Sequence, residues 1–530
     1  MTDDLAAVAR AWLAAEPDAD MRAELEELIA GRAQTLAERF TGRLQFGTAG
    51  LRAAVGAGPQ RMNRLVVRQA AAGLVDHLLA AEPHAATRGV IIGYDMRRKS
   101  DVFALDTARV CAARGVRAMI FRGVVPTPVL AWNITGSGAV AGVMVTASHN
   151  PPADNGYKVY LGTGAQIVPP ADTEISNSID LVDPCDVALS AEDDPLIEWL
   201  DESLVEAYLV AAPRVRFHDG LPGRPVAYTA MHGVGGATLL AAFARAGLAE
   251  PHVVTEQQQP DGTFPTVGFP NPEEPGAMDL LLAAAADVGA AVALANDPDA
   301  DRLGAAIPQR DGTWRRLTGD EIGALLADHI LRHTSGDDRL VITTLVSSSL
   351  LGRMASRYRV HSAETFTGFK WIAHTVLEHP QLRFLFGYEQ ALGYLVTDRP
   401  LDKDGITAGI LMAEVAALAE SEGLTLQDRL DEIAAEYGRH ITADLSLRMT
   451  PPEAAAAVAA LRADPPREIG GRTVTDTRWY PEAGLLRLQL GDEIRLQIRP
   501  SGTESKVKLY AEGLDLDPTP WLEALAARLR

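Results

Sequence analysis

The sequence predicts an α/β protein that has three similar mixed or parallel-sheet α/β domains and a C-terminal antiparallel α+β domain. Three observations lead to this class. The chain has 530 residues, which is too long for a single hydrophobic core. Between residues 65 and 421, apolar strand-like runs alternate with helical segments, as in βαβ units. After residue 450, short strand-like runs joined by tight turns lie between two helices, which indicates an antiparallel sheet.

The first predicted elements precede and form the first α/β block. Residues 5–40 place apolar side chains at helical spacing, broken at Glu16-Pro17-Asp18, so we expect two surface helices that form an extension and not a catalytic part. The block itself is predicted to contain helices at 65–79 and 102–114 and strands at 89–94, 117–121 and 139–145. Residues 183–195 are acidic and turn-rich and predict a linker, followed by a helix at 196–212.

The later elements follow the same logic. In the second block, strands are expected at 225–231, 252–255, 290–294 and 303–307, and helices near 236–247 and 277–288. In the third block, strand-like runs at 340–345 and 383–387 accompany a segment at 366–375 and a helix at 405–421. In the last region, a helix at 452–462 precedes strands at 472–476, 485–490, 493–498 and 506–512 and a terminal helix. The expected domains are 1–200, 201–315, 316–440 and 441–530.

Net charge, the absence of long apolar runs and the cysteine count exclude several classes of protein. The formal net charge of −21 argues against a nucleic-acid or anionic-membrane partner, whose phosphates such a surface repels. No apolar run is long enough to cross a bilayer, and the acidic Met1-Thr2-Asp3-Asp4 start differs from a signal peptide, so we expect a cytoplasmic protein. The only cysteines, Cys111 and Cys185, offer neither a disulfide framework nor a cysteine metal site. A phosphate-binding site in this chain must therefore be a local basic island.

Ser148 is the first candidate for chemistry. An apolar run at 139–145 predicts a buried strand, and the Asn150-Pro151-Pro152 that follows cannot continue a ladder, so Ser148 should lie on a strand-exit loop. Such loops often carry catalytic groups, although a simple turn fits this motif equally well. Asp95, Arg97 and Ser100 follow an earlier strand, where an ionic pair could steady the active loop; plain solvation is the alternative.

An aspartate-rich loop predicts a metal site. Asp297, Asp299 and Asp301 alternate directly after an apolar strand, and Arg302 follows them. Three like charges this close repel one another, whereas a hard divalent cation turns the repulsion into attraction. The loop lacks the glycine and distant glutamate of an EF-hand, and three protein oxygens with open positions suit Mg²⁺. A solvated acidic turn is the alternative.

Three further stretches supply groups for an anionic or hydroxylated ligand. Arg499-Pro500-Ser501-Gly502-Thr503-Glu504-Ser505-Lys506, with Lys508 behind it, forms the basic island and resembles a phosphate cradle. In Phe46-Gly47-Thr48-Ala49-Gly50-Leu51-Arg52, small residues allow close backbone approach and Arg52 could fork onto an oxyanion. The run from Gly387 to Tyr394, followed by Asp402-Lys403-Asp404-Gly405, supplies carboxylate, amide and phenol groups that suit a polyhydroxylated ligand.

Over residues 45–512, these motifs resemble the α-D-phosphohexomutases, the phosphoglucomutase and phosphomannomutase superfamily. The resemblance implies four domains around a central cleft, an isomerase that acts by intramolecular phosphoryl transfer, and a sugar 1,6-bisphosphate as activator. It implies a phosphoserine at Ser148 and Mg²⁺ bound by its phosphate with Asp297, Asp299 and Asp301. His149, Arg52, Arg302 and Lys158 are implied around the transferring phosphate, with Lys158 as the general acid/base. The implied sugar contacts are Thr367, Gly368, Lys370, Glu389, Ala391 and Tyr394, and the implied phosphate contacts are Arg499, Ser501, Gly502, Thr503 and Lys508.

The resemblance leaves the sugar open. The extension before residue 45, Thr367-Gly368-Phe369-Lys370 and residues 402–405 look most like the branch of animal phosphopentomutase and glucose-1,6-bisphosphate synthase and long bacterial phosphoglucomutases. Many hexose-specific members have a serine and a histidine where this chain has Ala391 and Tyr394, and Ser505 replaces a usual proline. We expect a phosphoglucomutase first, then a phosphopentomutase and a phosphomannomutase. A bisphosphate synthase and an inactive phosphosugar-binding scaffold are the other hypotheses.

Overall fold

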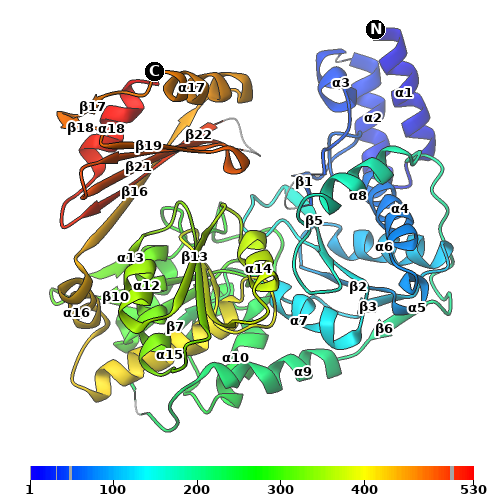
Figure 1. Ribbon diagram of the computed structural model, residues 1–530. Coiled ribbons are helices and arrows are strands. Elements are labelled where there is room, and N and C mark those ends of the chain that lie inside the picture. The colour runs from blue at the N-terminus through cyan, green and yellow to red at the C-terminus, as the bar shows by residue number, and fades with distance from the viewer. Residues whose placement is uncertain (1, 32, 47–49, 222, 502–505, 530) are drawn as a thin grey trace. The chain divides into compact units, whose positions relative to one another are not determined.

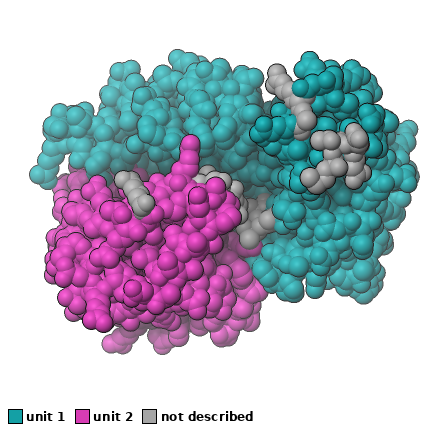
Figure 2. Space-filling model, turned by 90° about the horizontal axis from the view of Figure 1, so that it is seen from above, with its two compact units in different colours: residues 1–316, 393–418 teal, residues 317–392, 419–530 magenta. Residues whose placement is uncertain are grey.

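A computed structural model describes residues 2–31, 33–46, 50–221, 223–501 and 506–529. The chain forms two compact units, drawn in two colours in Figure 2. The first comprises Met1–Arg316 and Gly393–Leu418, and the second comprises Leu317–Leu392 and Ala419–Arg530. No helix among the described residues is long and apolar enough to cross a membrane.

The first unit begins with three helices, where the sequence predicts two (Figure 1): α1 (Thr2–Ala15), α2 (Ala19–Gly31) and α3 (Ala33–Phe40). The expected break at Pro17 separates α1 from α2. These helices are more than a surface extension, because Trp12, Leu25 and Phe40 are buried in the same hydrophobic core as the first sheet. Burial of such side chains contributes roughly 1.5–3 kcal/mol each, so the extension is an integral part of this core.

The first sheet has the strand order β1-β5-β4-β2-β3-β6. Its strands are β1 (Leu51–Ala54), β2 (Val90–Tyr94), β3 (Ala118–Phe121), β4 (Ala141–Val145), β5 (Asp154–Leu161) and β6 (Ile197–Leu200). Strands β4, β2, β3 and β6 are parallel. Strand β5 pairs antiparallel with β4, and β1 pairs antiparallel with β5, so β1 runs in the same direction as β4. The accompanying helices are α4 (Arg64–Ala81), α5 (Ala85–Arg88), α6 (Ser100–Ala113), α7 (Thr127–Ser137), α8 (Ala171–Asp180), α9 (Ser203–Ala211) and the 3₁₀ turn η1 (Ala212–Val215).

One expected element of this sheet is wrong. The predicted helix at 196–212 begins as strand β6, which pairs in parallel with β3, and becomes helical only at Ser203. Ile197 and Leu200 are buried, whereas the two residues between them are exposed, a pattern that one turn of helix can also show. Residues 197–200 therefore form a strand because they pair with the open edge of β3. Such a partner is distant in the chain, so the local sequence does not reveal it.

The second sheet has the order β11-β10-β9-β7-β8. Its strands are β7 (Val226–Thr229), β8 (His252–Val253), β9 (Val292–Asn296), β10 (Leu303–Pro308) and β11 (Trp314–Arg316). Its helical segments are α10 (Gly235–Arg245), η2 (Thr255–Gln257) and α11 (Asp279–Val288). Strands β9 and β10 are antiparallel neighbours, so the aspartate loop between them is a tight connection at one sheet end. The short strand β15 (Gly393–Leu395) and most of α15 (Gly405–Ser421) also belong to this unit.

The second unit contains the third and fourth sheets. Strand β12 (Arg339–Thr344) pairs in parallel with β13 (His361–Thr365) and β14 (Arg383–Glu389). The accompanying helices are α12 (Gly319–Arg332), α13 (Leu350–Tyr358), α14 (Phe369–Glu378) and α16 (Leu426–Tyr437). The three α/β regions predicted from alternating segments are thus confirmed.

The fourth sheet is antiparallel, as predicted, in the order β16-β22-β21-β20-β19. Its strands are β16 (His440–Arg448), β19 (Asp476–Tyr480), β20 (Leu485–Leu490), β21 (Ile494–Pro500) and β22 (Lys506–Leu514). Helices α17 (Pro451–Ala463) and α18 (Thr519–Ala527) pack on it (Figure 1). The small hairpin β17 (Glu468–Ile469) with β18 (Arg472–Thr473) and the 3₁₀ turn η3 (Pro481–Ala483) complete the region.

Candidate active site

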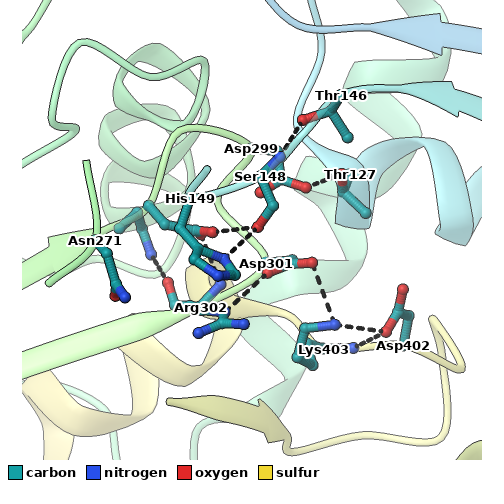
Figure 3. A network of polar contacts seen from close by, with 12 residues as sticks. Thr127, Thr146, Ser148, His149, Asn271, Asp299, Asp301, Arg302, Asp402 and Lys403 are labelled. Atoms are coloured by element: carbon teal, nitrogen blue, oxygen red, sulfur yellow. Dashed lines mark hydrogen bonds and ion pairs between the residues drawn. The ribbon is translucent and has the colours of Figure 1, made fainter. Parts of the chain in front are cut away.

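Ser148 lies directly after β4 on a strand-exit loop and has a left-handed backbone with φ of 50°. Its amide donates to Thr146 Oγ1 at 2.8 Å, which fixes the turn. Its hydroxyl donates to Asp297 Oδ2 at 2.7 Å, and His149 Nδ1 lies 3.2 Å from Ser148 Oγ (Figure 3). A left-handed non-glycine residue is uncommon and often marks a functional turn. The loop thus brings the serine oxygen to the aspartate triad.

The loop after β2 steadies the serine loop, as the ionic-pair interpretation predicts. The Arg97 guanidinium lies 3.4 Å from Asp95 Oδ2 and donates to the main-chain oxygens of Ser148 and Asn150 at 2.5 and 2.6 Å. The Ser100 hydroxyl donates to Asp95 Oδ1 at 2.7 Å. All three side chains are buried, so these bonds are shielded from competing water.

The aspartate triad occupies the connection between β9 and β10. Asp297, Asp299 and Asp301 are at most 1% exposed, and their ligand oxygens lie within 4.8 Å of one another. Asp299 Oδ1 and Asp301 Oδ1 are buried without a hydrogen-bond partner among the described residues. Buried carboxylate oxygens without donors are costly, and a divalent cation would satisfy them together. The residues present therefore fit a hard metal ion.

Positive groups surround the other carboxylate oxygens. Lys158, on β5, donates to Asp299 Oδ2 at 2.7 Å and to Asp301 Oδ2 at 2.8 Å. Lys403 lies 3.2 Å from Asp301 Oδ2, and Figure 3 shows it between Asp301 and Asp402. The Thr127 hydroxyl, at the start of α7, donates to Asp299 Oδ2 at 2.6 Å. These donors fix the orientation of the carboxylates from three separate elements.

The pKa values of the triad and of Lys158 are set by burial, by repulsion between carboxylates and by attraction to lysines. Burial alone would raise the pKa of Asp301, but Lys158 and Lys403 hold it below its ordinary value. Burial and the two neighbouring carboxylates raise the pKa of Asp297 well above its ordinary value. Burial would lower the pKa of Lys158, yet the two carboxylates that it contacts raise it. The triad thus carries more negative charge than its protein cations balance easily, and added positive charge would stabilise it.

Arg52, Arg302 and His149 lie around the same loops. Arg52 is on β1 and donates to Asn150 Oδ1 at 3.0 Å. Its strand packs so closely on β5 that a Cβ on Gly50 would lie 1.9 Å from the Tyr157 main-chain oxygen, which explains the glycine. The Arg302 amide donates to Asp297 Oδ1 at 3.0 Å. Burial and the positive charges of Arg302 and Arg52 lower the pKa of His149 well below its ordinary value, which favours a neutral imidazole.

The predicted sugar contacts are brought together only in part. Glu389 ends β14, and its Oε1 accepts from the Gly368 amide at 3.2 Å. Thr367 has a buried hydroxyl that lacks a hydrogen-bond partner within the described part of the chain. Lys370 is buried, with its ammonium 5.4 Å from the Trp371 ring centre. Ala391 is half-buried next to this loop, whereas Tyr394 is fully buried in β15 of the first unit.

The predicted phosphate loop connects β21 and β22. Arg499 faces Lys508 across the two strands, and the Ser501 amide donates to the Lys506 main-chain oxygen at 2.9 Å. The Arg499 Nε is buried and has no hydrogen-bond partner among the described residues, which leaves it available to an anion. Gly502 and Thr503 lie outside the described residues.

Residues 402–404 contact other protein groups. Their expected suitability for a polyhydroxylated ligand stays a prediction. Asp402 Oδ2 accepts from Tyr160 and Gln166 at 2.8 and 2.7 Å, and Asp404 accepts from the Tyr208 hydroxyl and from amides at the start of α15. Lys403 joins the aspartate triad. Neither Lys403, which lies 102 residues after Asp301, nor Thr127 leaves a sequence signal for its contact with the triad.

The site combines a serine at a strand end with a buried aspartate triad and a buried lysine. The fold combines three α/β regions with an antiparallel α+β region. Together they define a phosphosugar mutase, which is an intramolecular phosphotransferase. The chain belongs to the phosphoglucomutase/phosphomannomutase family. Models of α/β/α domains I, II and III of that family match residues 43–184, 208–311 and 318–437, and its C-terminal domain matches residues 445–529. The predicted superfamily resemblance is confirmed.

Relatives agree with the family and differ in the sugar that their names state. A probable phosphomannomutase of Haemophilus influenzae is 42% identical over 86% of this chain and 94% of its own length. A probable phosphoribomutase of Schizosaccharomyces pombe is 35% identical (94% and 92% covered), and human glucose 1,6-bisphosphate synthase is 34% identical (94% and 88%). The crystal structure of a putative phosphomannomutase from Thermus thermophilus shares the fold, with a TM-score of 0.72, 24% identity, and 92% and 99% of the two chains covered.

Proposed function

We propose that this enzyme interconverts a sugar 1-phosphate with the 6- or 5-phosphate through a phosphoserine at Ser148 and a sugar bisphosphate intermediate. The observation that carries the proposal is the 2.7 Å hydrogen bond from the Ser148 hydroxyl to Asp297, within a triad in which Asp299 Oδ1 and Asp301 Oδ1 are buried without a hydrogen-bond donor among the described residues. A hydrolytic nucleophile needs an adjacent base and an oxyanion hole, whereas a phosphate carrier needs neutralising charge around its oxygens. His149 Nδ1 lies 3.2 Å from Ser148 Oγ, but the buried aspartate triad with Lys158 bonded to it supports the phosphate carrier.

We propose Mg²⁺ as the cofactor, held by Asp297, Asp299, Asp301 and the Ser148 phosphate. A phosphoserine carries a charge of roughly −1.5 to −2. Next to three aspartates, that charge requires a cation, and the buried oxygens Asp299 Oδ1 and Asp301 Oδ1 are positioned for one. When bound, Mg²⁺ supplies neutralising charge and polarises the phosphoryl group.

The proposed reaction has two steps, in which a phosphoryl group passes first from Ser148 to the sugar and then from the sugar back to Ser148. In the first, the phosphorus–Oγ bond of phosphorylated Ser148 breaks as a free sugar hydroxyl forms its bond to phosphorus, and the hydroxyl proton passes to the serine oxygen. Lys158 is proposed to carry this proton as general acid/base, and Arg52, Arg302 and His149 to stabilise the transferring phosphoryl oxygens. In the second, the bisphosphate returns its other phosphoryl group to Ser148, and the proton moves the opposite way.

Substrate binding is assigned to the second unit. Glu389, with Thr367, Gly368 and Lys370, is proposed to contact the sugar hydroxyls, because a carboxylate, a free hydroxyl and an ammonium suit them. Arg499, Ser501 and Lys508 are proposed to hold the phosphate that does not react, together with the expected Gly502 and Thr503. A sugar 1,6-bisphosphate would act as activator by phosphorylating Ser148.

Glucose phosphate is our leading substrate, and a pentose phosphate is the second candidate. The pentose is favoured by Ala391, since an alanine there offers no hydroxyl to a hexose. Relatives named probable phosphoribomutase and phosphopentomutase are 35–36% identical to this chain, which supports the same alternative. Human glucose 1,6-bisphosphate synthase supports the hypothesis that the bisphosphate is released instead of turned round.

A substrate panel tests the proposal. Glucose, mannose, ribose and deoxyribose 1-phosphates are assayed for conversion with Mg²⁺ and a catalytic amount of sugar bisphosphate. We expect one sugar to exceed the others in kcat/KM and Ser148→Ala to abolish every conversion. Conversion that persists in Ser148→Ala would overturn the phosphoserine route. Accumulation of bisphosphate in place of the product phosphate would identify a synthase.

A further inference from the structure

The turn between α1 and α2 makes an acidic contact with the loop that follows β2. Lys99 Nζ lies 2.6 Å from Asp18 Oδ2 and 3.2 Å from Asp20 Oδ1. Arg98 also pairs with Asp20, at 2.5 Å. The Lys99 and Asp18 side chains are only 15% and 13% exposed, so water screens this pair far less than an ordinary surface pair. Three ion pairs thus tie the N-terminal helices to residues 98 and 99.

The same loop carries the groups that hold the serine loop from the other side. Arg97 donates to four main-chain oxygens of that loop, those of Ser148, Asn150, Pro151 and Asp154, at 2.5–3.0 Å. From strand β5, the Asn155 side-chain amide donates to the Arg98 main-chain oxygen at 3.0 Å. Residues 97–100 therefore contact the N-terminal helices on one side and the serine loop on the other.

Two non-glycine residues with a left-handed backbone, Lys99 and Ser148, lie at the two sides of these contacts. Lys99 has a left-handed φ of 67°, which costs a non-glycine residue free energy, and it immediately precedes α6. Ser148 has a left-handed φ of 50° at the other end of the Arg97 contacts. Strained residues persist where surrounding contacts over-determine them, and Lys99 is held by its ion pairs and by the Phe103 amide, which donates to its main-chain oxygen at 2.9 Å.

Resting on the proposed role of Ser148, we propose that Asp18 and Asp20 are positioning residues for phosphoryl transfer. Through Lys99 and Arg98, their carboxylates hold the residue 95–100 loop so that Arg97 keeps the Ser148 loop in its left-handed turn. The N-terminal extension then helps to position the active-site loops, in addition to contributing side chains to the hydrophobic core. Without the ion pairs, the loop and Arg97 sample other positions, and the competent arrangement of Ser148 is less populated.

The chain offers a matched control within the same helices. Glu24, on α2, pairs with Arg39 at 2.9 Å and accepts from the Ala57 amide at 2.9 Å. Its contacts lie within the extension and the segment after β1, and none of those described reaches residues 95–100. Glu24→Gln therefore removes a comparable ion pair from the extension without touching the serine-loop support.

The experiment compares the double variant Asp18→Asn/Asp20→Asn with Glu24→Gln and wild type. We expect kcat to fall about five- to tenfold in the double variant, with KM for the sugar phosphate unchanged, and both to stay at wild-type values in Glu24→Gln. Hydrogen exchange of the amides at residues 146–156 should rise in the double variant alone. Lys99→Met should lower kcat by the same factor, whereas Lys99→Arg should keep wild-type kcat. If the double variant does not fold, these two Lys99 variants are compared in its place.

Two results would overturn the inference. One is wild-type kcat and wild-type exchange at residues 146–156 in the double variant or in Lys99→Met. The other is an equal loss in Glu24→Gln, which would mean that the extension acts only through general stability. A wild-type enzyme that neither accepts phosphate on Ser148 nor shows mutase activity would refute the proposed function instead, while the exchange comparison would still decide whether the ion pairs hold the loop.

Discussion

Replacement of Asp299 by asparagine separates the proposed metal role of the triad from its structural role. Asp299 Oδ2 accepts from Thr127 and Lys158, and an asparagine oxygen can accept the same bonds. The change also removes repulsion between Asp299 and Asp301, and Lys158 keeps its bond to Asp301. We therefore expect Asp299→Asn to change the stability of the metal-free protein by about 1 kcal/mol or less.

Cation binding should respond far more strongly. Loss of a supporting group at a metal site typically costs 10- to 100-fold in affinity, and loss of a charged ligand should reach at least about 100-fold. At a free Mg²⁺ concentration of about 100 times the wild-type Kd, binding stabilises the folded protein by about 2.7 kcal/mol. For an affinity that is about 100-fold weaker, the same concentration stabilises by only about 0.4 kcal/mol.

Thermal melting with and without Mg²⁺ measures this difference, and calorimetric titration gives the two Kd values directly. We expect a clear Mg²⁺-dependent rise in the melting midpoint of wild type, almost none in Asp299→Asn, and similar midpoints for both proteins in chelator. Two outcomes would refute the reasoning. One is an equal Mg²⁺ response in both proteins, and the other is an unfolded Asp299→Asn variant in the absence of metal.

Three further predictions concern other parts of the site and its support. Lys158→Met should lower kcat by about 10²- to 10⁴-fold in the mutase assay while Mg²⁺ affinity does not fall, because an ammonium that competes for the carboxylates is removed; an unchanged kcat would contradict the acid/base role. Arg499→Ala should raise KM for the sugar phosphate about tenfold or more without preventing phosphorylation by a bisphosphate, and an unchanged KM would contradict the phosphate role. Burial alone would raise the pKa of Glu512, but Arg495 and a hydrogen bond from His440 lower it to about 2, below its ordinary value of 4.5. A depressed pKa stabilises the fold above pH 4.5 by about 3 kcal/mol and loses this contribution as the pH falls to 2, so the melting deficit of Glu512→Gln should be large at pH 7, reduced by about half near pH 3 and small only near pH 2; a deficit independent of pH would contradict it.

Most of the fold was predictable because local patterns and tertiary structure agree. The buried parallel strand at residues 141–145 is a continuous apolar run, and the helix at 405–421 matches its predicted bounds. Strand β6 was not predictable, because Ile197 and Leu200 become a strand by pairing with β3. The third N-terminal helix was also missed, since the pattern over residues 5–40 shows only one break.

The candidate site was predictable where its residues are close in sequence. The alternation of Asp297, Asp299 and Asp301 after an apolar strand already indicates convergence on a loop. Thr127 was not found, because it is 172 residues away from Asp299 and meets it only through the packing of α7 beside the second sheet's loop. The contact of Lys403 with Asp301 is likewise absent from the sequence interpretation, which treats residues 402–405 only as groups that suit a polyhydroxylated ligand.

Intact-mass measurement of the purified enzyme tests the central claim most directly. Dephosphorylated protein is incubated with a sugar 1,6-bisphosphate and Mg²⁺, and the mass and the modified residue are then determined. The phosphoserine mechanism predicts the gain of a single phosphate, located on Ser148, and its loss again on incubation with a sugar monophosphate. Protein that gains no phosphate, or a Ser148→Ala variant that gains the same phosphate as wild type, would contradict it.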